Sequence, residues 1–336
     1  MKISRFYKKK NFRELLKYSE IRYNKLTSVE KIYLCLAIFE LGFLDEFLDL
    51  FEYFFSKNQL VIEKYLFERN SEEYCKLILY KALAHFGLGE YANAHINIRE
   101  SISMSRLYSS EAKKWEELLC LSGLSDPSYF IENNNLRFYF MDKSNEQEIA
   151  FFIKKYQVSY DDITFFFTST PRKKTDVYIY KGRKDVIGNR LSYSNPHLGT
   201  IHANLYDENG HELTHVICQS FSENYSDWDP FVKEGIAEHF NSSCYEIDVT
   251  KFPSTMDLFN VWTRFSDYNV QVSYPIAKLF FDTLISVVDR DELFIFLQHP
   301  NLQNAKKRFK DKFNEITALF YKNYYQIVEN PIERIK

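Results

Sequence analysis

The stretch His211-Glu212-Leu213-Thr214-His215 is followed, after 18 residues, by Glu234-Gly235-Ile236-Ala237-Glu238. On an α-helix, residues four apart share a face, so His211 and His215 can direct imidazole nitrogens at one point. Glu212 then lies beside that point, where a carboxylate can take a proton from water. We therefore predict a helix that begins almost at His211 and carries two metal ligands.

A second helix is predicted to supply a third ligand. Asp229 is a good N-cap and Pro230 suits the first helical position, which places Glu234 on the second turn. A turn through residues 221–228 can fold this carboxylate back onto the two histidines. Two His and one Glu leave a fourth position open for water, which is the ligand set of a catalytic zinc ion. We therefore predict one catalytic Zn²⁺.

The composition of the chain is that of a globular protein. Its 336 residues favour two domains, 45% of them are apolar and the net charge is −3. This balance predicts neither a nucleic-acid partner nor a membrane partner. The five cysteines include no C-x-x-C pair, no apolar run reaches the length of a membrane span, and the basic N-terminus lacks the apolar stretch of a secretory signal. We expect a cytoplasmic protein.

Residues 1–125 are predicted to form an all-helical, repeat-like domain. Leu36-Ala-Ile-Phe-Glu-Leu-Gly42 aligns with Leu83-Ala-His-Phe-Gly-Leu-Gly89, 47 residues later, and the second copy resembles a tetratricopeptide helix-turn-helix. An extra helix near residues 60–68 would account for the long period, and an irregular helical bundle is the alternative. The predicted helices are Ser28–Leu41, Phe43–Lys57, Glu72–Leu88 and Tyr91–Ser105.

The pattern changes at the loop Leu124-Ser-Asp-Pro127, which we take as the domain boundary. Residues 126–336 are predicted to form a second domain, with a helix at Asn145–Tyr156 and helices again from His211 onward. Strands followed by helices predict an α+β fold. The strand-like runs are Leu136–Met141, Ile163–Thr168, Thr175–Tyr180 and Leu198–Leu205.

The motif H-E-x-x-H, 18 residues and E-G-x-A resembles the thermolysin-like (gluzincin) zinc peptidases. It is similar to the aminopeptidase-N family and, through E-G-I-A-E and Trp228, more similar to the smaller peptidase MA-like proteins. The resemblance spans residues 130–328 and includes Tyr274-Pro-Ile-Ala277-Lys-Leu-Phe280 and a basic-aromatic end helix at Lys306–Val328. It implies a zincin-like (thermolysin-like) catalytic domain.

The resemblance also implies that Tyr274 would stabilise the oxyanion. Glu212 would be the general base, and Glu238, one turn after Glu234 on the same helix face, would orient a ligand histidine. The strand at 198–205 would be an edge along which an extended peptide substrate pairs. Aminopeptidases of the related family carry a G-x-M-E-N stretch, which residues 180–206 lack, so an endopeptidase is favoured.

Other interpretations stay open. Glu238 can be a surface charge and Tyr274 a core residue, and His197, His202 and His239 are expected to be structural. The basic segment 151–206 favours acidic substrates or is a solvated face. The turn Asp207–Gly210 lacks the usual apolar anchor, so we expect Asp207 to cap the helix. The whole chain can also be an inactive, regulatory peptidase-like protein whose helical repeats bind a protein partner.

Overall fold

The computed structural model describes two compact units. One unit comprises residues 1–143, 172–178 and 197–200, and the other comprises 144–171, 179–196 and 201–336. No helix within the described ranges is long and apolar enough to cross a membrane. The residues described are 2–54, 72–104, 106–119, 129–142, 145–181, 192–205, 210–222, 224–241, 252–253 and 255–329.

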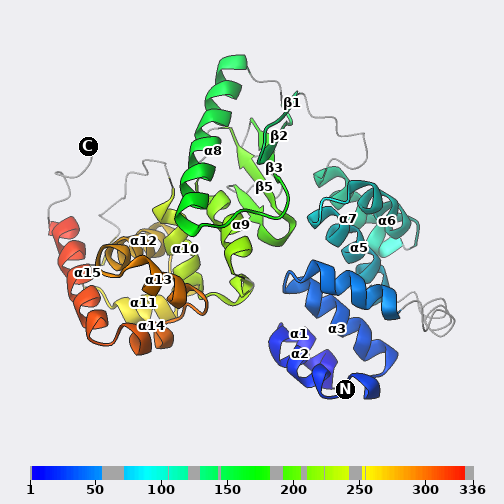
Figure 1. The fold of residues 1–336 in the computed structure, drawn as a ribbon, viewed down its shortest axis with the longest axis horizontal. Helices are drawn as coiled ribbons and strands as arrows, with labels where there is room; N and C mark the ends of the chain where they lie inside the picture. Colours follow the sequence, from blue (N-terminus) through cyan, green and yellow to red (C-terminus); the bar gives the residue numbers. More distant parts are fainter. Residues whose placement is uncertain are drawn as a thin grey trace. The chain divides into compact units, whose positions relative to one another are not determined.

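The first unit begins with helices, as predicted (Figure 1). The helix α3 starts with a capping box in which Thr27 and Glu30 satisfy each other's backbone N–H groups. The predicted helix near 60–68 and the predicted boundary near 125 lie outside the described residues. Residues 44–54 are also helical. The helices of this unit whose two ends are both described are α1 (Lys2–Lys8), α2 (Phe12–Glu20), α3 (Ser28–Glu40), α5 (Glu72–Gly87), α6 (Tyr91–Met104) and α7 (Arg106–Leu118).

The two sequence copies have the same backbone at their glycines. Gly42 and Gly89 both have φ of 82°, a conformation that glycine adopts without strain. The N–H of Phe43 donates to the carbonyl of Ile38, and the N–H of Glu90 donates to that of His85. Each glycine thus ends a helix through a Schellman-type cap, after which the next helix begins.

The sheet has five strands in the order β1-β2-β3-β5-β4. Strands β1 and β2 are antiparallel, with Tyr129 opposite Phe140. Strands β3 and β5 run parallel: the N–H of Asp176 donates to the Gly199 carbonyl and, further along both strands, the N–H of Leu205 donates to the Tyr180 carbonyl. Our expectation that 198–205 is an edge strand is wrong, because β5 lies between β3 and β4. The strands are β1 (Tyr129–Glu132), β2 (Leu136–Phe140), β3 (Thr175–Tyr180), β4 (Tyr193–Asn195) and β5 (Thr200–Asn204).

The long helix α8 (Glu146–Phe167) replaces the strand predicted at Ile163–Thr168. The aromatic and β-branched residues of this run favour strands, but they continue the helical burial pattern of Phe152, Tyr156 and Ile163. The helix ends at Thr168, whose φ is 49°, and Arg290 donates to the carbonyls of Phe165 and Phe166. The predicted helix at 145–156 is therefore correct but too short.

The second unit is otherwise helical. Phe231 and Phe280 pack against Trp262 at ring-centroid distances of 4.6 and 4.9 Å, which builds the core between α10, α11 and α12. The single end helix predicted at Lys306–Val328 is two helices, because the chain turns at Lys310, with φ of 45°. The helices are α9 (His211–Phe221), α10 (Pro230–His239), α11 (Leu258–Thr263), α12 (Val270–Val287), α13 (Arg290–Leu297), α14 (Leu302–Phe309) and α15 (Asp311–Glu329).

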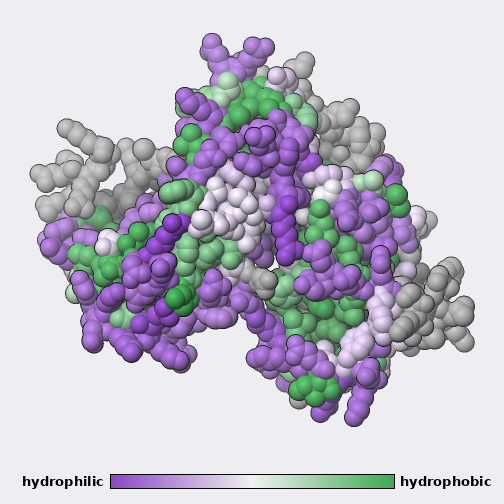
Figure 2. All heavy atoms as spheres, in the orientation of Figure 1, coloured by the Kyte–Doolittle hydropathy of each residue, from purple (hydrophilic) through white to green (hydrophobic). Residues whose placement is uncertain are grey.

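The described chain is mostly helical and has one small mixed sheet, which is compatible with the α+β class. Hydrophilic side chains cover most of the face seen in Figure 2, with hydrophobic ones gathered in separate patches. The described cysteines Cys35, Cys75 and Cys218 are buried and form no disulfide.

Candidate metal centre

The first motif helix begins where the sequence predicts. Gly210 is the N-cap of α9 and has no side chain that could cap the helix. Asp207, the residue that we expected to cap it, lies outside the described residues. A Cβ added at Gly210 would lie 1.7 Å from the carbonyl oxygen of Phe240, so glycine lets this end of α9 lie against the end of α10. Leu213 and Ile217 are fully buried along the same helix. Backbone packing at Gly210 and apolar side chains within α9 thus anchor the helix.

The second motif helix also starts as predicted. The Asp229 side chain accepts a 3.0 Å hydrogen bond from the N–H of Phe231, and Pro230 is the first helical residue of α10. Gly235, next to the predicted ligand, faces α12 so closely that an added Cβ would lie 2.7 Å from the Ala277 carbonyl oxygen. The position of α10, and with it Glu234, therefore depends on the absence of a side chain at residue 235.

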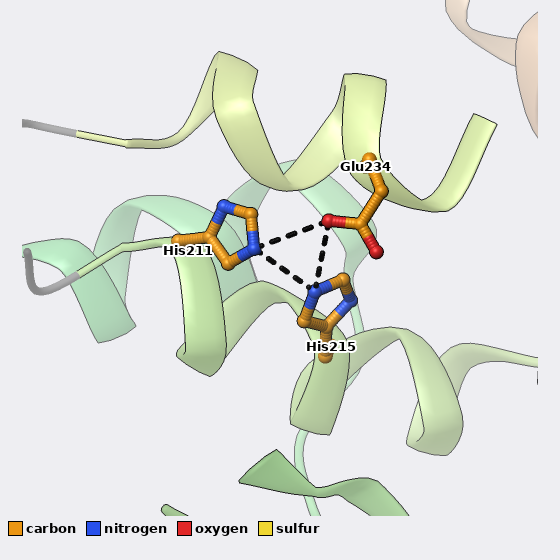
Figure 3. A group of neighbouring side chains, drawn as sticks. All are labelled: His211, His215 and Glu234. Carbon is orange, nitrogen blue, oxygen red and sulfur yellow. Dashed lines mark hydrogen bonds and ion pairs between the residues drawn. The ribbon is translucent and has the colours of Figure 1, made fainter. Parts of the chain in front are cut away.

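Three predicted ligands converge (Figure 3). His211 and His215 project from α9 toward Glu234, which projects from α10. The Nε2 atoms of the two histidines are 3.2 Å apart, and Oε2 of Glu234 lies 3.3 Å from His211 Nε2 and 3.8 Å from His215 Nε2. A tetrahedral zinc ion with bonds of about 2.0 to 2.2 Å separates its ligand atoms by about 3.3 to 3.6 Å. The triangle therefore fits zinc.

A buried polar atom without a hydrogen bond supports the same fit. Glu234 Oε2 is buried beside both imidazoles, yet it accepts no hydrogen bond from the described residues. Its 3.3 Å contact with His211 is close enough for an ion pair but is not aligned as a hydrogen bond. Buried polar groups in native proteins are nearly always satisfied, and a cation among the three atoms would satisfy this one.

The carboxylates shape the charge of the site. Burial alone would lower the pKa of His211, but Glu234, Glu238 and Glu212 together raise it well above its ordinary value. Burial and the neighbouring His211 lower the pKa of His215. Burial would raise the pKa of Glu234, but the two histidines hold it below its usual value. The site therefore places negative charge around one point and favours a cation there.

Two residues contact the outer nitrogens of the histidines. Oε1 of Glu238 lies 3.0 Å from His211 Nδ1, which is an ion-pair distance, although the two groups are not aligned as a hydrogen bond. The buried Tyr225 hydroxyl lies 2.5 Å from His215 Nδ1. Lys233 covers the Tyr225 ring at 4.9 Å and donates to the Ser226 carbonyl, which helps to hold that ring in place.

The two predicted catalytic groups lie next to His211, Glu212 as its neighbour in the chain and Tyr274 through a ring contact. Glu212 Oε2 accepts a 2.6 Å hydrogen bond from the Ser194 hydroxyl, on strand β4. The Tyr274 ring, on α12, stacks on His211 with centroids 6.0 Å apart. Burial first, and then the negative charge of Glu234, raise the pKa of Tyr274, so this phenol stays protonated and can donate.

The three histidines that we predicted to be structural, His197, His202 and His239, have contacts typical of that role. His202 is buried on β5 and stacks on Tyr193, and burial lowers its pKa to about 3. Burial also lowers the pKa of His197, whose ring packs edge-on against Phe39. His239 Nδ1 lies 2.6 Å from Asp282 Oδ1. None of these three belongs to the group of ligand atoms formed by His211, His215 and Glu234.

Comparison of the chain with models of protein families, with curated proteins and with solved structures finds no match. The geometry of the site is therefore the basis on which we infer a function.

Sequence reasoning missed Tyr225 and Ser194. Tyr225 is one of 25 tyrosines, and its position between the two motif helices is the only local signal. Ser194 lies in a three-residue strand, 18 residues before Glu212, and no pattern links the two. Both contacts arise from tertiary packing.

Proposed function

We propose that this chain is a zinc-dependent peptidase with a zincin-like domain. In this proposal His211, His215 and Glu234 are the residues that would hold the zinc ion. The observation that carries the proposal is the triangle of ligand atoms, with edges of 3.2, 3.3 and 3.8 Å. Zinc bound there would polarise a substrate carbonyl and lower the pKa of water. Three protein ligands leave one position open, as in catalytic sites.

The side chains around the triangle have complementary roles in this proposal. Glu212 takes a proton from the attacking water and delivers it to the leaving amine. Ser194 holds the Glu212 carboxylate through its 2.6 Å hydrogen bond. Tyr274 stays protonated and donates a hydrogen bond to the oxyanion of the tetrahedral intermediate.

The short strand β4 is the edge strand that we propose for substrate binding. It lies at one end of the strand order, and its central residue contacts Glu212. An extended peptide that pairs with β4 would therefore have its backbone beside the general base. Backbone pairing tolerates many side chains, which suits an endopeptidase of broad sequence preference.

The test is a zinc measurement combined with cleavage of unfolded protein and a peptide library. We expect about one zinc per chain and a fall in kcat of roughly 10²- to 10⁴-fold for Glu212→Gln, with the metal retained. Glu52→Gln, at an exposed helical position, is the matched control and should keep full activity. A chain without zinc would disprove both the site and the mechanism.

A second candidate function is partner binding by the helical unit. A groove of about 360 Å³ is lined mostly by apolar side chains, and the exposed carboxylates of Glu20 and Glu46 border it without an ion pair to any described residue. This combination suits an apolar peptide segment that carries a basic side chain. The lining residues are Leu16, Ser19, Glu20, Tyr23, Leu34, Ile38, Phe43, Glu46 and Leu50.

The two functions separate experimentally. Ile38→Asp should abolish binding of labelled Leu- and Arg-containing peptides, measured by fluorescence anisotropy, and leave zinc content unchanged. Ile21→Asp, at a site 84% exposed and outside the groove, is the control. Zinc without cleavage of any library peptide would favour the regulatory function over the peptidase.

A further inference from the structure

The outer face of α8 exposes three large apolar side chains at a spacing of seven residues. Phe151, Val158 and Phe165 have 63%, 53% and 80% of their surfaces exposed. Seven residues are nearly two helical turns, so the three side chains form one stripe along the helix, which we call the α8 stripe. A single exposed apolar residue is ordinary, but a periodic row of them marks a surface that packs against another helix.

The charges beside the α8 stripe are arranged symmetrically about its centre. Lys154 and Lys155 lie four and three residues before Val158, and Asp161 and Asp162 lie three and four residues after it. All four side chains are exposed, and none forms an ion pair with another described residue. The lysine pair and the aspartate pair are seven residues apart, too far to meet within one helix.

This pattern is self-complementary. In an antiparallel pair of α8 helices centred on Val158, Phe151 lies near Phe165 of the second copy. Each lysine pair then faces the aspartate pair of the second copy. A parallel pair would instead place like charges side by side. A two-fold axis requires a surface that complements itself, and the antiparallel arrangement meets that requirement.

We propose that two copies of this chain associate through antiparallel α8 helices, with Val158 on the two-fold axis. In Figure 2, hydrophobic and hydrophilic side chains lie next to each other along α8. The opposite face of the helix is buried in the chain's own core and includes Phe152, Tyr156 and Ile163. A contact between two helices is small, below about 1,200 Å² in total, so the dimer is weak and transient.

Sedimentation velocity at chain concentrations from about 1 to 500 µM tests the proposal, because we expect a dissociation constant in the micromolar range for so small a contact. We expect the wild-type chain to shift from monomer to dimer as its concentration rises. Val158→Glu places two like charges on the axis and should weaken association by at least about tenfold. Ile96→Glu, at a site 65% exposed on α6, is the matched control and should leave association unchanged.

Charge exchange tests the orientation. A chain with Lys154→Asp and Lys155→Asp, and a chain with Asp161→Lys and Asp162→Lys, should each stay monomeric alone. Mixed together they should form a heterodimer, because opposite charges again face each other. Thermal unfolding of each variant checks that α8 stays folded. A monomeric wild-type chain, a dimer insensitive to Val158→Glu, or variants that fail to restore pairing when mixed would overturn the proposal.

Discussion

The hydroxyl of Tyr225 lies 2.5 Å from Nδ1 of His215, and both side chains are buried. Burial raises the pKa of Tyr225 well above its ordinary value, so the phenol stays protonated. When Nε2 of His215 binds a metal, Nδ1 carries the proton and donates to the phenol oxygen. Tyr225 then fixes both the tautomer and the direction of this ligand.

Tyr225→Phe should therefore weaken zinc binding by about 10- to 100-fold, the usual effect of removing a group that orients a metal ligand. Competition with a fluorescent chelator measures the affinity. Tyr129→Phe, at a half-exposed strand position, is the matched control. An unchanged affinity in Tyr225→Phe would show that packing alone orients His215.

Ser194→Ala should lower kcat by about 10- to 100-fold while KM and zinc content change little, because the hydrogen bond to Glu212 orients the base and not the substrate. Ser194→Thr keeps the hydroxyl and should restore most of the rate. Steady-state kinetics on one cleaved peptide separates kcat from KM. Equal losses in the alanine and threonine variants would instead indicate a requirement for the small side chain.

Zinc should stabilise the folded chain, because the ligand triangle exists only when α9 and α10 are packed together. At a free zinc concentration of about 1,000 times Kd, the free energy of unfolding should rise by about 4 kcal/mol. Urea unfolding with buffered zinc measures this rise, and a chelator should reverse it. His215→Ala should remove the effect, whereas His95→Ala, at an exposed position on α6, should retain it.

Much of the site could be predicted because its signals are local. The spacing of His211, His215 and Glu234 follows from helix geometry, and Asp229 and Pro230 mark the start of α10. The same local reasoning failed at Ile163–Thr168, where side-chain preferences for strands conflicted with the burial pattern of α8. The position of β5 inside the sheet could not be predicted, since strand order depends on long-range pairing.

His202 should make the chain less stable in mild acid. Its pKa is about 3 in the folded chain, because burial disfavours the charged ring, against an ordinary value of 6.5. Between these values the unfolded chain binds more protons than the folded chain, so stability falls as the pH falls. The contribution is fully present above pH 6.5 and decreases by about 1.4 kcal/mol per pH unit below it.

Urea unfolding at pH 7 and pH 5 measures this effect. The wild-type chain should lose about 2 kcal/mol more than His202→Gln between the two pH values, because glutamine does not titrate. The other histidines are common to both proteins and cancel in the difference. Parallel pH dependences would mean that His202 is protonated in the folded chain.

Gly235→Ala should damage the metal site through the backbone. The added Cβ would lie 2.7 Å from the Ala277 carbonyl oxygen, and since that oxygen belongs to α12, the helices α10 and α12 must move apart. Overpacking of this kind costs about 1 to 3 kcal/mol of unfolding free energy.

Because Glu234 is the residue before Gly235, the same movement should displace its carboxylate from His211 and His215 and lower zinc affinity. Ala150→Ser, at an exposed position on α8, is a control for a substitution of similar size. Urea unfolding and chelator competition report the two effects separately. A Gly235→Ala chain that loses stability but binds zinc normally would show that α9 shifts together with α10. The distances between the three ligand atoms would then stay unchanged.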